Sequence, residues 1–196
     1  MKLYFTAAAA VALLASSPSY AVSVMSAGQT VQEDCFHAAQ TQARAPLSDR
    51  ELRLGLAACN SALTGDMSQL TRAGTLVNRG ILQAAAGKTD AAIADFDAGL
   101  AGDPGLSAGY MNRGAVFLKT GRYSQARADF DRAIALGVAD LHVAYFNRGE
   151  AQEASGDLLA AYHDYRKAQQ LAPDFKPASL ELARFQVTQR RVADTR

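Results

Sequence analysis

Residues 107–140 read SAGYMNRGAVFLKTGRYSQARADFDRAIALGVAD, and this stretch decides the fold because its pattern recurs on both sides. The tripeptide Asn-Arg-Gly occurs at 78–80, 112–114 and 147–149, with its glycines 34 and then 35 residues apart. Three further series keep the spacing: Gly87, Gly121 and Gly156; Ala92, Ala126 and Ala161; Phe96, Phe130 and Tyr165. Self-similarity at one fixed period predicts a repeat protein.

Each repeat is predicted to hold two helices. First helices are expected at 74–86, 108–120 and 143–155, and second helices at 90–101, 124–136 and 158–171. Gly87, Gly121 and Gly156 suit the left-handed residue that closes a first helix. Thr89, Ser124 and Asp157 are suitable N-caps for the second helices.

The second helices carry a stripe of small and aromatic residues. Ala126, Phe130 and Ala133 are spaced by four and three residues and therefore share one helix face. The same stripe recurs at Ala92, Phe96 and Gly99, and at Ala161, Tyr165 and Ala168. Together with Gly80, Gly114 and Gly149 on the first helices, it predicts close helix packing with a ring filling each gap.

These repeats resemble the tetratricopeptide-repeat (TPR) family, whose 34-residue unit pairs two antiparallel helices. The middle unit is the most complete, with Tyr110, Gly114, Phe117, Tyr123, Ala126, Phe130 and Ala133, although Val138 stands where the family has proline. The resemblance covers 73–174, in units at about 73–106, 107–140 and 142–175. It implies an all-α solenoid of helical hairpins that winds as a right-handed superhelix.

The flanking segments are expected to cap the solenoid, since repeat stacks need polar terminal elements. Segment 32–72 is interpreted as a degenerate hairpin, with Gly55, Cys59 and Ala62 at second-helix spacing. Residues 177–192 are predicted to form a capping helix, with Pro177 in its first turn and Leu180, Ala183 and Val187 on its apolar stripe.

The start of the chain has the pattern of a secretory signal. Residues 1–21 combine Lys2, an apolar run from Leu3 to Ala15 and small residues at Ser19 and Ala21. We expect cleavage after Ala21, a flexible segment at 22–31, and a periplasmic or secreted protein, with a Gram-negative bacterium as the expected source. No later stretch is apolar enough to insert in a membrane.

Cys35 and Cys59 are the only cysteines. An even pair in an oxidising compartment favours a disulfide. The two residues also lie at equal distances from the turn near Leu47, which places them at one level of a helical hairpin. The alternative is a reactive Cys35 with His37, but residues two apart on a helix do not face each other.

The composition argues against several functions. With 20 basic and 19 acidic residues the formal net charge is +1, unlike that of a nucleic-acid binder. The three histidines show no metal-ligand spacing, and phosphate-loop and nucleophile motifs are absent from the sequence. We therefore expect no enzyme activity, cofactor or metal, and the recurring Arg79, Arg113 and Arg148 are interpreted as architectural.

The family resemblance implies that the first helices line a concave groove for a protein or peptide partner. Carried onto this chain, the groove comprises Val77, Asn78, Ile81, Met111, Asn112, Phe146, Asn147 and Glu150. The asparagine amides would hold a peptide backbone, or else they serve local hydrogen bonds. Val77, Val143 and Asn147 replace cationic residues of the carboxylate clamp seen in some family members. Glu150 and Glu153 would favour a basic partner, or are a solvated pair.

The expected function is thus an interaction module of the cell envelope that binds a peptide or partner protein on its concave face. The alternative is a non-catalytic structural subunit of a homo-oligomer or envelope assembly.

Overall fold

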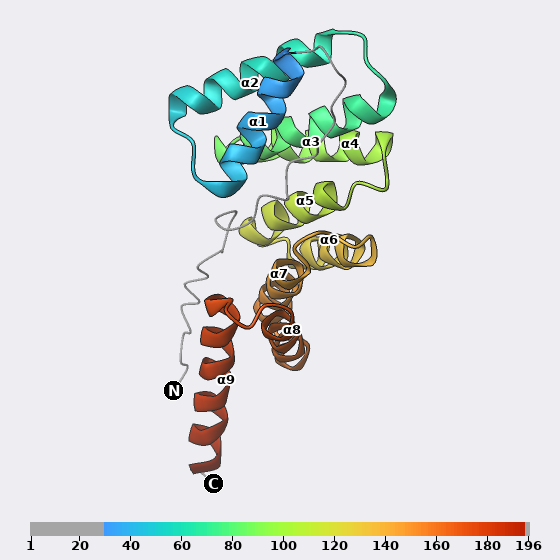
Figure 1. The fold of residues 1–196 in the computed structure, drawn as a ribbon. Coiled ribbons are helices and arrows are strands. Elements are labelled where there is room, and N and C mark those ends of the chain that lie inside the picture. The colour runs from blue at the N-terminus through green and yellow to red at the C-terminus, as the bar shows by residue number, and fades with distance from the viewer. Residues whose placement is uncertain (1–29, 195–196) are drawn as a thin grey trace.

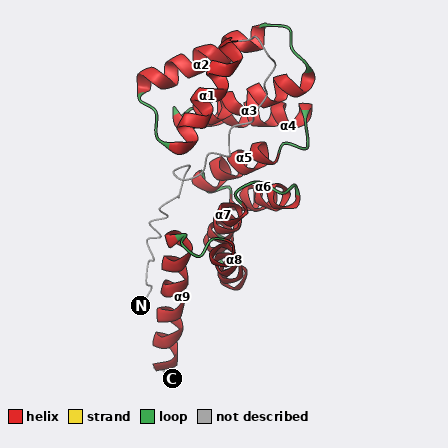
Figure 2. Cartoon of the chain, in the orientation of Figure 1, coloured by secondary structure: helices red, strands yellow, loops and turns green. Residues whose placement is uncertain are grey.

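The computed structural model describes residues 30–194, with side chains described from 31 to 185. This part of the chain consists of nine α-helices joined by loops, without a β-strand (Figure 2). The expected signal peptide and most of segment 22–31 lie outside the described residues. Among the helices that are described, none is both long and apolar enough to cross a membrane.

The helices form successive antiparallel hairpins that stack into a solenoid (Figure 1). Helices α1–α4 lie at one end of the stack and α8 and α9 at the other. Their bounds are α1 Thr30–Arg44, α2 Asp49–Thr64, α3 Gln69–Ala85, α4 Thr89–Gly102, α5 Ser107–Lys119, α6 Tyr123–Ala135, α7 Leu141–Ala154, α8 Leu158–Leu171 and α9 Lys176–Asp194. The all-α TPR solenoid expected from the repeat pattern is confirmed.

The repeated glycines set how closely the two helices of a hairpin approach. A Cβ atom built on Gly114 would lie 2.8 Å from Cε1 of Phe130, which is closer than real Cβ atoms come to a ring. Gly80 meets Phe96 and Gly149 meets Tyr165 in the same way, at 2.7 and 2.8 Å. The rings are fully buried. The predicted small-to-aromatic packing is therefore confirmed.

Most helix ends follow the repeat, but two predicted caps are wrong. Gly87, Gly121 and Gly156 have φ angles of 74°, 75° and 91°, as expected of left-handed closing residues. Asp157 caps α8 by accepting a bond from the Ala160 N–H at 3.1 Å. Thr89 and Ser124 instead lie inside α4 and α6, because these helices begin immediately after Lys88 and Arg122, neither of which makes a side-chain cap.

The N-terminal hairpin is closed by its cysteines. Cys35 of α1 and Cys59 of α2 are buried at disulfide distance, with their Cα atoms 4.7 Å apart. Gly55 permits the approach, since a Cβ there would lie 2.6 Å from the Cβ of Ala38. The next helix, α3, begins at Gln69 behind the N-cap Ser68, five residues earlier than the expected start at 74.

Helix α9 packs through a different face from the one predicted. Ala178 and Leu182 are buried, and Phe185 contacts the rings of Tyr162 and Tyr165. Leu180 is 70% exposed and Ala183 is exposed, while the side chain of Val187 lies outside the described residues. The prediction failed because apolar residues occur on more than one face of this helix, so spacing alone did not select the packed one.

A ladder of ion pairs joins the hairpins. Arg113 of α5 donates two bonds to the carboxylate of Asp129 in α6, at 2.8 and 2.7 Å, and a third to Asp97 of the preceding hairpin at 2.5 Å. Arg148 binds Asp164 and Asp131 in the same way, and Arg79 binds Asp95 and the amide oxygen of Asn60. Each repeated arginine thus ties three helices together, in keeping with an architectural role.

Candidate functional site on the inner face

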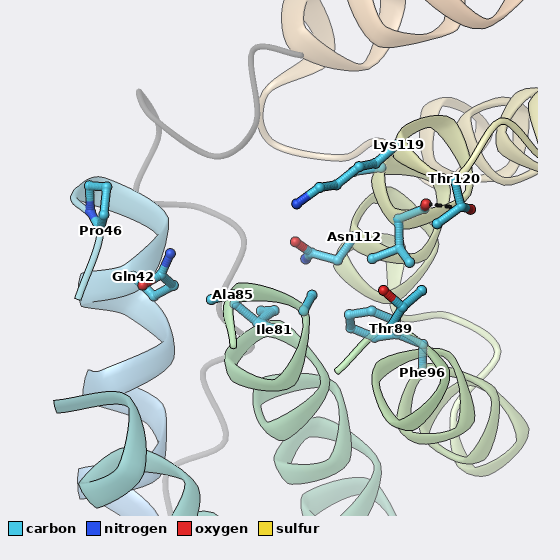
Figure 3. A pocket seen from close by; sticks show the side chains of 12 residues that line it. Gln42, Pro46, Ile81, Ala85, Thr89, Phe96, Asn112, Lys119 and Thr120 are labelled. Atoms are coloured by element: carbon cyan, nitrogen blue, oxygen red, sulfur yellow. Dashed lines mark hydrogen bonds between the residues drawn. The ribbon is translucent and has the colours of Figure 1, made fainter. Parts of the chain in front are cut away.

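A pocket of about 220 Å³ opens between the inner faces of α1, α3 and α5 (Figure 3). Its lining comes from four helices, the loop after α1 and the turn after α5: Gln42, Pro46, Ile81, Ala84, Ala85, Thr89, Phe96, Asn112, Ala115, Val116, Lys119 and Thr120. The pocket lies on the side of the solenoid where the first helices of successive hairpins face one another.

The pocket has an apolar floor and a polar rim. Ile81 and the buried ring of Phe96 are apolar, as are the alanines of α3 and Ala115. Figure 3 shows Lys119 reaching from α5 toward the α1 side, where Gln42 stands. The Oε1 of Gln42 accepts the Leu47 N–H at 2.9 Å, so its amide nitrogen is the donor that it can present to a ligand. Lys119 and the Gln42 amide nitrogen thus place two donors at the rim.

The pocket brings together two of the eight groove residues expected from the sequence, Ile81 and Asn112. Val77, Met111 and Phe146 lie in the hydrophobic core and are at most 2% exposed. A Cβ added at Gly99 would come within 2.9 Å of Val77, which shows how tightly that side chain is enclosed. These three side chains therefore pack in the core and do not line the pocket.

The three repeated asparagines are buried. The Nδ2 of Asn112 donates to the Ala108 carbonyl one turn earlier in α5, at 2.8 Å, which is a local bond of the kind weighed for these residues. Asn112 also lines the pocket, whereas the Oδ1 of Asn147 is buried without a hydrogen-bond partner. Asn112 and Asn147 therefore occupy equivalent positions in their repeats but differ in their hydrogen bonds.

The family positions of Lys119 and Ala84 face the expected groove, but sequence reasoning did not gather them with Gln42 and Ala85 into a pocket. The place of Lys119 in the repeat was visible in the sequence, since it follows the middle Asn-Arg-Gly by five residues. Gln42 belongs to the N-terminal hairpin, which departs most from the repeat. Only the three-dimensional packing of α1 beside α3 brings it to this pocket.

A second polar region lies on α7, α8 and α9. Tyr165 donates its hydroxyl to Glu153 at 2.9 Å, and Arg184 binds both Glu153 and Glu181. Burial, reinforced by the charges of Glu181 and Glu153, raises the pKa of Glu150 to about 8. Burial together with these carboxylates also raises the pKa of Tyr165. The region is therefore rich in acceptors, in contrast to the pocket.

Comparison with known proteins agrees with this geometry. The family model of the tetratricopeptide repeat matches residues 107–136 and 142–175. The chain belongs to the tetratricopeptide-repeat family. It is 41% identical over 64 residues to protein unc-45 homolog B of Xenopus tropicalis, a match that covers 33% of this chain and 7% of that relative. This TPR protein thus spans only a small part of the length of the curated relatives that it matches.

Solved TPR structures share the fold over most of the chain. The first TPR of Spaghetti (RPAP3), bound to the HSP90 peptide SRMEEVD, has a TM-score of 0.59 and 27% identity, covering 64% of this chain and 99% of that one. MamA from Desulfovibrio magneticus RS-1 has a TM-score of 0.67 and 21% identity, covering 82% of this chain and 86% of that one. The second likeness concerns the fold alone.

Proposed function

We propose that this TPR protein is an interaction module whose inner face holds an extended segment of a partner protein, with the pocket of α1, α3 and α5 as its anchoring point. The observation that carries the proposal is the pocket itself, an apolar floor with donors at its rim. Such a site suits an apolar side chain whose neighbouring backbone carbonyls accept hydrogen bonds. The first TPR of RPAP3 binds a peptide, which supports a peptide segment as the kind of partner.

The size of the pocket favours a side chain over a small molecule. Its volume of about 220 Å³ is below the roughly 300–1,000 Å³ of drug-sized ligand sites. The floor is built from alanines and from side chains fixed in the core, so it is formed before any ligand arrives. Preformed sites lose little conformational entropy on binding.

The test uses the full chain as bait in a cell-envelope fraction. Ala115→Arg fills the pocket, and Lys119→Glu reverses the rim charge on an exposed side chain. Arg127→Glu, on the exposed surface of α6 away from the pocket lining, is the control. Captured proteins are identified by mass spectrometry, and overlapping peptides from them are measured by fluorescence anisotropy. We expect both pocket variants to lose the peptide and the control to keep it. Equal binding by all three, with native circular dichroism, would exclude this pocket.

We further propose that the protein works in the cell envelope. The signal pattern of residues 1–21 and the Cys35–Cys59 pair both support an oxidising location. Expression of the whole sequence in a Gram-negative host should give a periplasmic protein that begins at Val22. Intact mass and N-terminal sequencing check this, and Ala21→Asp should block the cleavage. Recovery of the uncleaved wild-type chain from the cytoplasm would contradict the proposal.

The second candidate function is a structural subunit that self-associates. It is favoured by Leu158, Leu159 and Leu180 on α8 and α9, each more than half exposed. Sedimentation velocity over a range of concentrations separates the two functions. A mass that rises with concentration, and falls in Leu159→Ser, would support assembly. A constant monomer mass would exclude it.

A further inference from the structure

Two buried acceptors lie one repeat beyond the pocket. Asn147 and Glu150 stand 35 residues after Asn112 and Ala115, which line the pocket on α5. The repeat therefore places Asn147 and Glu150 on the inner face of α7, one helical turn apart. Asn147 is 95% buried, and its Oδ1 has no hydrogen-bond partner; the Oε2 of Glu150 is likewise buried and unpartnered. Buried oxygens of this kind are normally satisfied, so the pair calls for a donor.

The surroundings of this pair are acidic. Glu153 of α7 and Glu181 of α9 both act on Glu150 electrostatically. Arg184 of α9 binds these two neighbours, and its shortest contacts with them are 2.5 and 2.6 Å. Arg184 binds Glu153 and Glu181 with its one guanidinium, and Glu150 lies within electrostatic reach of the same two carboxylates. The region has spare acceptor capacity where a partner would lie.

The oxygen atoms of this site determine which kind of ligand it can bind. Once Glu150 is ionised, its carboxylate and the Asn147 amide oxygen both accept hydrogen bonds, and a donor from the partner would complete them. A metal ion would also suit oxygens, but the described residues include no group of three His, Cys, Asp or Glu side chains arranged to hold one. A lysine ammonium or an arginine guanidinium supplies both the donors and the charge.

We propose that Asn147, Glu150 and Glu181 form an acceptor site for a lysine or arginine side chain of the bound partner segment. This proposal rests on the proposed function, because it assigns a residue type to a segment lying along the same inner face. It gives that segment a direction as well: an apolar residue in the pocket near α1 and a basic residue toward α9. The acidic Glu-Glu-Val-Asp end of the peptide bound by RPAP3 would be repelled at the α9 end.

The state of Glu150 makes binding depend on pH. Its pKa of about 8 means that the free protein holds a proton there at neutral pH. A bound cation favours the carboxylate and expels that proton, so affinity should rise with pH up to about 8 and then level off. The titratable groups that face Glu150 are Glu153 on α7, Tyr165 on α8 and Glu181 on α9, and Arg184 of α9 binds Glu153 and Glu181.

The experiment measures fluorescein-labelled Gly-Lys and Gly-Arg repeat octapeptides against the full chain by anisotropy, with a Gly-Glu repeat as the negative probe. The test variants are Glu150→Gln and Glu181→Gln, separately and together. The control is Glu33→Gln with Asp90→Asn, which changes net charge as much but lies on α1 and α4. Because the chain has a formal net charge of only +1, general attraction of a polycation is weak.

We expect the double variant to lose at least about tenfold in affinity for the basic probes, and the control to stay within about twofold. Affinity of the wild type should rise between about pH 6 and pH 8, and this rise should vanish in Glu150→Gln. Equal binding by all variants, or no binding of the basic probes, overturns the proposal. The proposed function is judged separately, since it fails only if Ala115→Arg and Lys119→Glu keep the natural partner's peptide.

Discussion

At the scale of single residues, the close contact between Gly114 and Phe130 predicts whether Gly114→Ala raises or lowers the free energy of unfolding. Helix propensity alone would make Gly114→Ala stabilising by about 0.5–1 kcal/mol. The added methyl group would, however, lie 2.8 Å from the ring, and overpacking of this kind costs roughly 1–3 kcal/mol. We expect net destabilisation, measured by urea unfolding. The loss should shrink in a Phe130→Leu background, and a stabilised Gly114→Ala would show that the helices separate freely.

Glu150 gives a second prediction at the same scale, through pH. Its pKa is about 8 in the folded chain against 4.5 as the ordinary value, so the folded state binds more protons in between. Stability should therefore fall as pH rises from about 4.5 to 8 and be flat with respect to this group above that. Urea unfolding at about pH 5 and pH 8.5 should show a smaller fall for Glu150→Gln than for wild type. Glu33→Gln is the control; parallel falls in all three proteins would show that Glu150 titrates normally.

Single residues also show how far sequence could reach. Gly80, Gly114 and Gly149, with their rings, were predictable because steric fit between two helices leaves a periodic trace. The burial of Val77, Met111 and Phe146 was not, because family position says which way a side chain points and not how closely neighbours cover it. The pocket depends on Gln42, which belongs to no clear repeat.

At the scale of helices, the arginine ladder fixes how neighbouring hairpins sit against each other. The acidic partners had a signal that sequence reasoning passed over, since Asp95, Asp129 and Asp164 each precede the repeated ring. Asp129 is buried and held bidentately by Arg113, whereas Asp97 on the preceding hairpin is 56% exposed. Burial raises the pKa of the Asp129 carboxyl, and Arg113 opposes that rise. The two acceptors of one guanidinium therefore differ in what they contribute.

This difference predicts unequal substitutions. Arg113→Met leaves the buried Asp129 carboxylate without its partner and should cost about 3 kcal/mol. Asp97→Asn removes only an exposed pairing and should cost less than about 1 kcal/mol. Unfolding is measured in urea, because guanidinium chloride is a salt and would screen these charges. Similar losses in both variants would mean that the link between hairpins, and not the link within one, carries the stability.

Helix α9 shows that sequence spacing can predict a helix without predicting which of its faces packs. An amphipathic pattern predicted the helix and its Pro177 start correctly, since α9 begins at Lys176. The same pattern predicted that Leu180 and Ala183 lie on the packed face, whereas the buried residues are Ala178 and Leu182. The packed face of this helix depends on the rings of Tyr162 and Tyr165 that Phe185 meets, and the apolar spacing of the helix alone does not reveal them.

At the scale of the whole molecule, a solenoid should respond locally to damage at one end, because each repeat contacts only its neighbours. Helix α1 packs on α2 and α3, far along the chain from α7–α9. Breaking the Cys35–Cys59 link frees a loop with a sequence separation of 24 residues, at a cost of about 3 kcal/mol by the chain-entropy model. Hydrogen exchange of the reduced protein should therefore rise in α1 and α2, extend weakly into α3, and leave α7–α9 unchanged. Cys35→Ser with Cys59→Ser should reproduce this pattern and should not respond to reductant. Uniformly faster exchange along all the helices would instead make the chain one cooperative unit, in which the N-terminal hairpin stabilises the distant acidic site as strongly as the pocket beside it.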